Sequence, residues 1–269
     1  MSALVPRLPA HARSTIEIFL RAHALSDGRD GVVVGLSGGI DSAVTARLAR
    51  DALGPAHVLG VMMPDAAFPA ALLTETAEYA RALGIEVRTV PIDPIERAFA
   101  QALPDGADVV SVGNTKARIR MVVAYTIARQ HRRLVTGTGN KSELLLGYFT
   151  KYGDGGVDLL PIGDLYKTEV RALAAELGLP EAIRSRPPTA GLWEGQTDEA
   201  ELGAPYEVVD RVLRGFEELR SEAEIVAATG IDPARVRDIA RRIAESRHKR
   251  RPPPIPKLGL RTVGIDWRE

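Results

Sequence analysis

The chain has 269 residues, of which 45% are hydrophobic and 26% are charged, a composition that excludes a disordered or collagen-like protein. Its 35 basic residues equal its 35 acidic ones, which argues against a dedicated nucleic-acid-binding protein, although a local basic patch stays possible. The chain has no cysteine, which excludes a disulfide framework, a thiolate metal site and a cysteine nucleophile. No stretch approaches the ~18 uninterrupted apolar residues of a membrane span, and the N-terminus lacks a secretory signal, so we expect a cytoplasmic protein without a membrane partner.

The first half of the chain alternates predicted helices and strands. The predicted strands are at 31–36, 57–63, 86–90 and 133–136, and the predicted helices are at 12–26, 41–53, 70–83, 94–103 and 111–131. This alternation is typical of βαβ units, so we predict an α/β fold with a doubly wound, mostly parallel sheet and helices on both faces. Ligands of such sheets bind at the carboxyl ends of the strands, where the most informative loops therefore begin.

The pattern changes after residue 150. Residues 150–163 are glycine-rich and irregular, 164–178 predict a helix, and 184–204 predict a long loop of the kind that is usually functional or mobile. Helices are predicted at 205–217 and 232–247, followed by an extended proline-rich segment at 251–256. We predict a single domain over 1–269, with a core at about 12–180, a C-terminal loop and helical extension at 181–256 and an extended tail at 257–269.

A glycine-rich loop stands where the first predicted strand turns into a helix, with the sequence Gly35-Leu-Ser-Gly-Gly-Ile-Asp-Ser42. Consecutive glycines let the backbone approach a ligand, and the helix that follows points free N–H groups and its positive dipole end at the same place. Ser37 and Ser42 can add hydroxyl donors. The loop therefore suits a phosphate or pyrophosphate, although it is neither a Walker A loop nor a dinucleotide fingerprint.

Asp41 decides what this loop binds. A carboxylate inside an anion cradle repels phosphate unless a cation lies between them, and Mg²⁺ prefers one or two carboxylates together with phosphate oxygens. Asp41 is therefore predicted to be a magnesium ligand beside a nucleotide; the alternative is a tight turn in which Asp41 merely caps the helix. The string Ser-Gly-Gly-x-Asp-Ser resembles the pyrophosphate-binding loop of the N-type ATP pyrophosphatases, which adenylylate a substrate oxygen and then displace AMP with a nucleophile.

Two further segments carry charged side chains. On the predicted helix at 111–131, Lys116 and Arg120 share one face and Arg118 points elsewhere; from charge alone, a solvated basic face is the better interpretation. Glu143 falls in the first helical turn after the fourth strand, where it could simply favour the helix dipole. This loop leaves the same edge of the sheet as the first, so Glu143 can also share a Mg²⁺ with Asp41.

The later motifs identify the family that this sequence resembles. They are Lys116-Ala-Arg-Ile-Arg-Met121, Gly147-Tyr-Phe-Thr-Lys-Tyr-Gly-Asp-Gly155, Gly195-Gln-Thr-Asp-Glu-Ala-Glu-Leu-Gly203 and His248-Lys-Arg250. In this order they resemble the NAD synthetase family over roughly 12–256. The resemblance implies an adenine nucleotide alpha hydrolase-like fold and a homodimeric ligase. Such a ligase adenylylates the nicotinate carboxylate of deamido-NAD with ATP and amidates it with ammonia, giving NAD, AMP and pyrophosphate.

The resemblance also implies roles for individual residues. ATP would contact Gly35, Leu36, Ser37, Gly38, Gly39, Ile40, Asp41, Ser42, Thr138, Lys167 and Thr189. Mg²⁺ would be held by Asp41 and Glu143, which with Lys167 would be the catalytic residues. Deamido-NAD would contact Arg118, Lys151, Asp158, His248 and Lys249. The segment 63–69 departs from the serine-rich stretch that the family usually shows there, so its contacts are not carried over.

Several alternatives stay open. Asp154 or Asp158 could deprotonate bound ammonium, or both could only shape their loop or bind substrate. Glutamine-dependent members carry an amidase domain with a nucleophilic cysteine, which this sequence lacks, so we expect ammonia to be the nitrogen source. A tRNA-modifying or GMP-forming relative should lack the 148–154 and 196–203 strings. A non-catalytic nucleotide-binding regulator would have little reason to keep both Asp41 and Glu143.

Overall fold

The computed structural model describes residues 4–26, 28–103, 106–193, 195–263 and 266–267. Its central feature is one parallel sheet with the strand order β3-β2-β1-β4. The strands are β1 (Val32–Gly35), β2 (Val58–Met62), β3 (Glu86–Thr89) and β4 (Leu134–Thr136). The chain moves outward from β1 to β3 and then returns to the other side of β1 with β4. This confirms the predicted doubly wound parallel sheet, and it places the reversal of strand order between β1 and β4.

The strands form where short apolar runs can be buried on both sides. In β1, Val32, Val33 and Val34 are fully buried. Because successive side chains of a strand face opposite sides, Val33 packs in one hydrophobic cluster while its two neighbours pack in another. A continuous apolar run is typical of a strand that helices cover on both faces.

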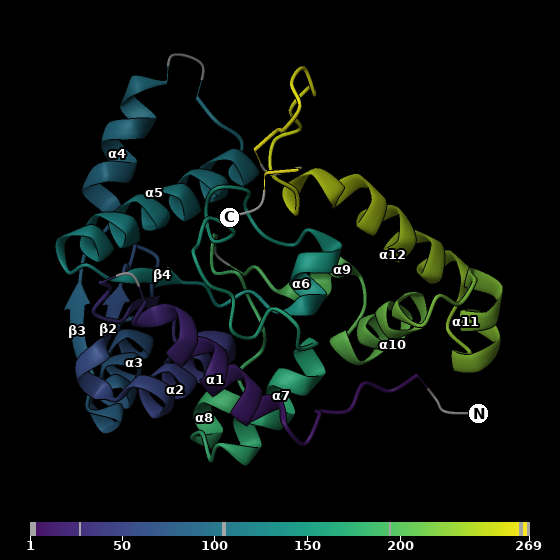
Figure 1. The fold of residues 1–269 in the computed structure, drawn as a ribbon, viewed down its shortest axis with the longest axis horizontal. Helices are drawn as coiled ribbons and strands as arrows, with labels where there is room; N and C mark the ends of the chain where they lie inside the picture. Colours follow the sequence, from purple (N-terminus) through teal and green to yellow (C-terminus); the bar gives the residue numbers. More distant parts are fainter. Residues whose placement is uncertain (1–3, 27, 104–105, 194, 264–265, 268–269) are drawn as a thin grey trace.

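Helices cover both faces of the sheet (Figure 1). The cluster on one face is built from α1 (Ala12–Ala24), α2 (Ile40–Leu53), α3 (Ala70–Leu83), α7 (Lys167–Glu176) and α8 (Glu181–Arg184). The cluster on the other face is built on α5 (Val109–Gln130), against which α4 (Asp93–Ala102) packs. Among the described residues, none of the helices combines the length and the apolar character needed to cross a membrane.

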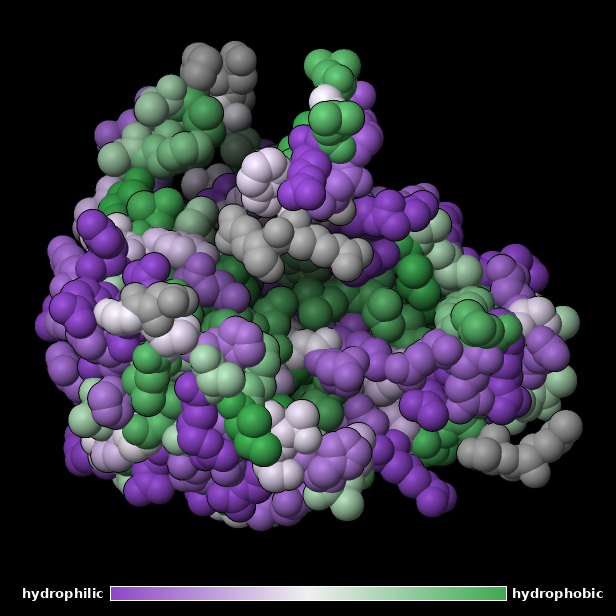
Figure 2. All heavy atoms as spheres, viewed as in Figure 1, coloured by the Kyte–Doolittle hydropathy of each residue, from purple (hydrophilic) through white to green (hydrophobic). Residues whose placement is uncertain are grey.

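The C-terminal helices have a hydrophobic cluster of their own. It joins α6 (Lys141–Leu146), α9 (Asp198–Leu202), α10 (Tyr206–Glu217), α11 (Glu222–Thr229) and α12 (Pro233–Glu245). In Figure 1 the helices α10 to α12 lie to one side of the sheet, and α12 leads into a short 3-10 turn, η2 (Ser246–Lys249). Figure 2 shows the molecule hollowed between the part that carries the sheet and these helices.

Three predicted boundaries differ from the structure. The helix predicted at 164–178 is shorter, because Tyr166 is its extended N-cap residue. The predicted long loop at 184–204 contains α9, a single acidic turn without apolar periodicity. Helix α11 was not predicted, although Ser221 and Glu224 form a capping box at its start. The predicted tail 257–269 is described only at 257–263 and 266–267; its other residues lie outside the described part of the chain.

One buried carboxylate ties the C-terminal helices to the helices beside the sheet. Asp210 of α10 is fully buried. Its Oδ1 accepts a hydrogen bond of 2.5 Å from the Ser142 hydroxyl of α6, and its Oδ2 accepts one of 2.9 Å from the Thr168 N–H of α7. The Ser142 oxygen in turn accepts the N–H of Lys167 at 2.9 Å. Asp210 therefore fixes the first turns of two helices at once.

We expect Asp210→Ala to lower the free energy of unfolding by about 2–4 kcal/mol, because it leaves two buried donors without an acceptor. Chemical denaturation with urea measures this loss. The matched control is Asp238→Ala on α12, whose carboxylate pairs with arginines near the surface, and we expect it to cost less than about 1 kcal/mol. Equal losses for the two variants would contradict the role given to Asp210.

Candidate active site

The glycine-rich loop after β1 forms a tight polar turn. The Ser42 hydroxyl donates to the carbonyl of Gly39 at 2.9 Å, and the N–H of Gly39 lies 3.3 Å from the Ser37 hydroxyl oxygen. Gly38 has a φ of +76°, and a Cβ there would lie 2.5 Å from the Leu72 side chain, so only glycine fits. Helix α2 begins with Gly39 as its N-cap residue and has no side-chain cap, which leaves backbone donors for a ligand.

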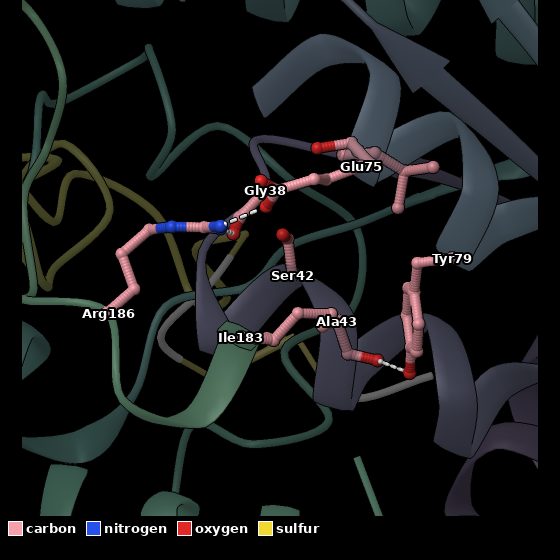
Figure 3. A pocket seen from close by; sticks show the side chains of 9 residues that line it. Gly38, Ser42, Ala43, Glu75, Tyr79, Ile183 and Arg186 are labelled. Carbon is pink, nitrogen blue, oxygen red and sulfur yellow. Dashed lines mark hydrogen bonds and ion pairs between the residues drawn. The ribbon is translucent and has the colours of Figure 1, made fainter. Parts of the chain in front are cut away.

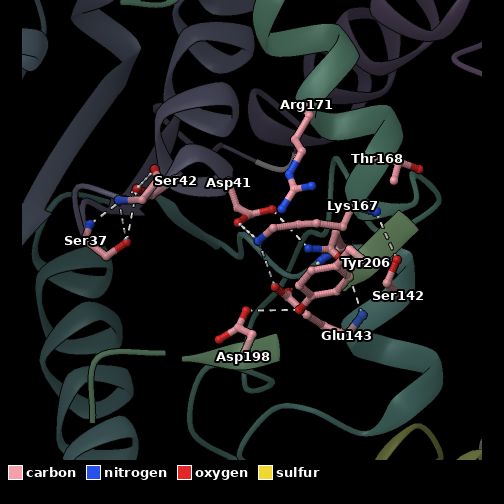
Figure 4. A network of polar contacts seen from close by, with 12 residues as sticks. Ser37, Asp41, Ser42, Ser142, Glu143, Lys167, Thr168, Arg171, Asp198 and Tyr206 are labelled. Carbon is pink, nitrogen blue, oxygen red and sulfur yellow. Dashed lines mark hydrogen bonds and ion pairs between the residues drawn. The ribbon is translucent and has the colours of Figure 1, made fainter. Parts of the chain in front are cut away.

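Asp41 does not cap helix α2; it contacts residues that come from other segments. Its Oδ2 lies 2.5 Å from Lys167 Nζ (Figure 4). Its Oδ1 accepts a hydrogen bond of 3.0 Å from Asn140 Nδ2. Lys167 Nζ also lies 3.4 Å from Glu143 Oε1. The three side chains therefore meet. For Asp41 and Glu143 this was expected, because their segments leave neighbouring strands at one edge of the sheet, whereas Lys167 comes from the start of α7.

The electrostatics of this group follow from burial and pairing. For Lys167, burial acts to lower the pKa, but the carboxylates of Asp41 and Glu143 outweigh it, so the pKa is raised. Burial raises the pKa of Glu143 to about 8 against the opposing charge of Lys167, and the nearby Asp41 adds to the rise. Glu143 also closes a capping box, since its Oε2 accepts the N–H of Asn140 at 3.1 Å. This geometry is compatible with both roles considered for Glu143: it favours the start of helix α6, and it can share a Mg²⁺ with Asp41.

The donor set fits a magnesium ion in the presence of phosphate. Two carboxylates, from Asp41 and Glu143, converge on a single cationic group, the ammonium of Lys167. Mg²⁺ is typically held by one or two carboxylates, with phosphate oxygens and water completing its shell. Within the described ranges, no group of three or more His, Asp or Glu side chains is placed to hold a metal by itself. A divalent ion here would therefore depend on oxygens of the bound nucleotide.

Two residues that line this centre had no predicted role. Asp198 of α9 is only 3% exposed, and its Oδ2 accepts a hydrogen bond of 3.0 Å from the Tyr206 hydroxyl. Lys167 Nζ lies 5.3 Å from the centre of the Tyr206 ring (Figure 4). Burial raises the pKa of Asp198, while the charge of Lys167 acts to lower it. The signal that could have found Asp198 is its place in the Gly195–Gly203 string.

A second group of predicted residues surrounds the glycine-rich segment 147–158. Arg118 of α5 donates to the carbonyl of Lys151 at 3.4 Å. Lys249 of η2 donates to the carbonyls of Gly147 at 2.7 Å and Phe149 at 2.8 Å. Burial lowers the pKa of Lys249. The structure thus brings Arg118, Lys151 and Lys249 to one loop, and Lys249 also hydrogen-bonds to the backbone of that loop.

Other predicted residues have different surroundings. Thr189 is exposed, and its hydroxyl donates within the long loop to the carbonyl of Gln196 at 2.7 Å. The Asp158 carboxylate accepts bonds from the Tyr125 hydroxyl at 3.0 Å and from the Val135 N–H at 2.7 Å. His248 is exposed on η2, and Thr138 is partly buried between β4 and α6. None of these contacts joins the Asp41–Lys167 group.

The solvated basic face considered for α5 is wrong for two of its three cations. Lys116 is 9% exposed, and its Nζ lies 2.9 Å from Asp65 Oδ2 and 3.3 Å from the carbonyl of Leu192. Arg120 Nη2 lies 3.6 Å from the same Asp65 oxygen. Asp65 belongs to the segment 63–69 that departs from the family pattern, and its buried carboxylate gives these cations a partner that charge counting alone could not reveal.

Comparison with known proteins identifies the family of this chain. Residues 13–253 match the family model described as NAD synthase. The chain belongs to this family. A curated NAD synthase relative, the "NH(3)-dependent NAD(+) synthetase" of Methanosarcina acetivorans, is 49% identical over 250 residues, which cover 92% of this chain and 98% of the relative.

Two solved structures are similar to this chain as well. The NMN synthetase of Francisella tularensis has a TM-score of 0.83 at 33% identity and covers 94% of this chain and 100% of its own. The NH3-dependent NAD synthetase of Campylobacter jejuni has a TM-score of 0.78 at 33% identity and covers 91% of this chain and 98% of its own. The predicted fold and family are thereby confirmed.

We expect Lys167→Met to make stability more sensitive to alkaline pH. The folded-state pKa of Glu143, about 8, exceeds the ordinary value near 4.5, so the stability that its proton gives falls as pH rises through this window. Without Lys167 the folded-state pKa of Glu143 rises further, so the stability continues to fall to a higher pH. Thermal unfolding at about pH 6 and about pH 9 should show the larger deficit at the higher pH. Lys257→Met, at an exposed position in the tail, is the control. A loss of stability in K167M that is equal at both pH values would contradict the account.

Proposed function

We propose that this chain is an ammonia-dependent ligase that adenylylates the nicotinate carboxylate of deamido-NAD with ATP and then amidates it, giving NAD, AMP and pyrophosphate. The observation that carries this proposal is the meeting of Asp41, Glu143 and Lys167 beside the glycine-rich loop in a chain of the NAD synthase family. The M. acetivorans relative, whose name states this dependence on ammonia, supports it.

In the first step, a carboxylate oxygen of the substrate attacks the α-phosphorus of ATP, and the bond to the β-phosphate oxygen breaks. The carboxylate is already ionised at neutral pH, so no general base is needed. Catalysis then depends on positioning and on neutralising the charge of the transferring group. Lys167 supplies one cation, and pyrophosphate leaves into the loop of Ser37 to Ser42. Mg²⁺, when bound by Asp41 and Glu143, would supply further charge neutralisation.

In the second step, the ammonia nitrogen attacks the acyl carbon, and the bond between that carbon and the AMP oxygen breaks. A proton must leave the nitrogen, and Asp154 is better placed to take it than Asp158. Asp158 is committed to Tyr125 and Val135, whereas Asp154 Oδ1 accepts the Thr150 N–H at 2.9 Å. Burial raises the pKa of Asp154, which makes its carboxylate a stronger base than an ordinary aspartate.

The binding residues are assigned within this proposal. ATP contacts the loop from Gly35 to Ser42 together with Thr138, Lys167 and Thr189, and deamido-NAD contacts Arg118, Lys151, Asp158, His248 and Lys249. Residues 1–269 act as one domain, since Asp210 joins the C-terminal helices to the catalytic segments. We also propose a cytoplasmic homodimer; exposed apolar side chains on α4 and α5, among them Phe99 and Val122, support an interface there.

A second candidate substrate is the nicotinate mononucleotide. The F. tularensis protein, which is similar over nearly the whole chain, is described as an NMN synthetase. The same two chemical steps on the mononucleotide would give NMN. The higher identity of the M. acetivorans relative favours the dinucleotide for this chain.

A single assay separates these possibilities. The purified chain is supplied with ATP, Mg²⁺ and either deamido-NAD or the mononucleotide, with ammonium or with ammonia-free glutamine, and AMP and amide products are quantified together. We expect NAD and AMP in equal amounts from deamido-NAD and ammonium. Faster turnover of the mononucleotide would assign the second substrate. Efficient turnover with glutamine, or no amide product from either substrate, would contradict the proposal.

A further inference from the structure

An arginine outside all the family motifs reaches the glycine-rich loop. Arg186 lies just after α8, at the start of the predicted long loop. Its Nη1 donates to the carbonyl oxygen of Gly38, and its Nη2 pairs with the carboxylate of Glu75 on α3 (Figure 3). The Arg186 side chain is 24% exposed, so it is held largely within the protein.

These contacts fix one peptide group of the loop. In a trans peptide the carbonyl and the N–H of the next residue point in opposite directions. The Gly38 carbonyl points to Arg186, and the N–H of Gly39 points to the Ser37 hydroxyl at 3.3 Å. Two glycines in succession make this peptide easy to rotate, and a rotation would turn a carbonyl oxygen toward a bound anion.

We propose that Arg186 is a positioning residue for pyrophosphate: by holding the Gly38 carbonyl outward, it keeps the Gly39 N–H directed into the cradle formed with Ser37 and Ser42. The inference rests on the proposed function, because that function places pyrophosphate in this loop. Glu75 neutralises and orients the guanidinium, so Arg186 acts through the peptide and not as a direct phosphate ligand. Because Arg186 stands at the start of the long loop, its hydrogen bond to Gly38 also holds that end of the loop beside the cradle.

The test compares binding of two products at a fixed Mg²⁺ concentration. Isothermal titration gives the Kd of pyrophosphate and of AMP for the wild type, Arg186→Gln, Arg186→Lys and Glu75→Gln. Loss of a charge-assisted hydrogen bond predicts a pyrophosphate Kd about tenfold or more higher in R186Q, with an AMP Kd within about twofold of the wild type. We expect R186K to recover part of the affinity, and KM for ATP to rise in R186Q.

A neighbouring arginine supplies the control. Arg184 ends α8, and the partners of its side chain are the Leu179 carbonyl and Glu181 rather than the glycine-rich loop, so Arg184→Gln should leave both Kd values unchanged. An R186Q variant that unfolds at the wild-type temperature and binds pyrophosphate normally would overturn the inference. Tighter pyrophosphate binding by E75Q would also overturn it, because a freed guanidinium would then be acting as a direct ligand.

The outcome for the wild type separates this inference from the proposed function. A wild-type chain that forms NAD, with normal pyrophosphate binding in R186Q, refutes the role of Arg186 alone. A wild-type chain that neither forms NAD nor binds pyrophosphate refutes the proposed function and, with it, the role of Arg186.

Discussion

The ammonium of Lys167, held between the carboxylates of Asp41 and Glu143, is the interaction on which the rest of the site depends. Its side chain is only 3% exposed, and an unpaired charge at that depth would be strongly destabilising. The pairing therefore requires three segments to meet: the loop after β1, the first turn of α6 after β4, and the first turn of α7. The parallel sheet makes this possible, because β1 and β4 are neighbours and end at the same edge.

A set of hydrogen bonds between buried and partly buried groups keeps these segments in place. Asn140 caps α6 and donates to Asp41, while the Lys167 N–H donates to the Ser142 hydroxyl, which in turn donates to Asp210 of α10. The C-terminal helices, which are remote from the sheet in sequence, thus determine where Lys167 and Glu143 stand. Arg186 acts in a similar way on the glycine-rich loop. The charge pairing in the site therefore depends on how the helices pack.

Much of the fold could be predicted from sequence, since the apolar runs of β1, β2 and β4 and the Gly84 stop of α3 are local signals. The meeting of Asp41 and Glu143 was also predictable, because strand order places both at one edge. The buried ion pair between Lys116 and Asp65 was not predictable, because residues 51 positions apart produce no periodic pattern in the sequence. Asp198 and Arg186 were missed for a related reason: each stands in a segment with little apolar periodicity, where only the folded chain supplies its partners.

The central claim is that Asp41 and Glu143 together form the adenylylation centre, and the kcat of conservative variants tests it most directly. For Asp41→Asn and for Glu143→Gln, we expect kcat at saturating substrates to fall by about 10²–10³, because each variant lacks a carboxylate that would hold Mg²⁺ in the transition state. Asp51→Asn, on the same helix as Asp41 but paired with Arg47 and Arg13, should keep kcat. Near-normal kcat in either D41N or E143Q, measured at limiting Mg²⁺, would contradict the account.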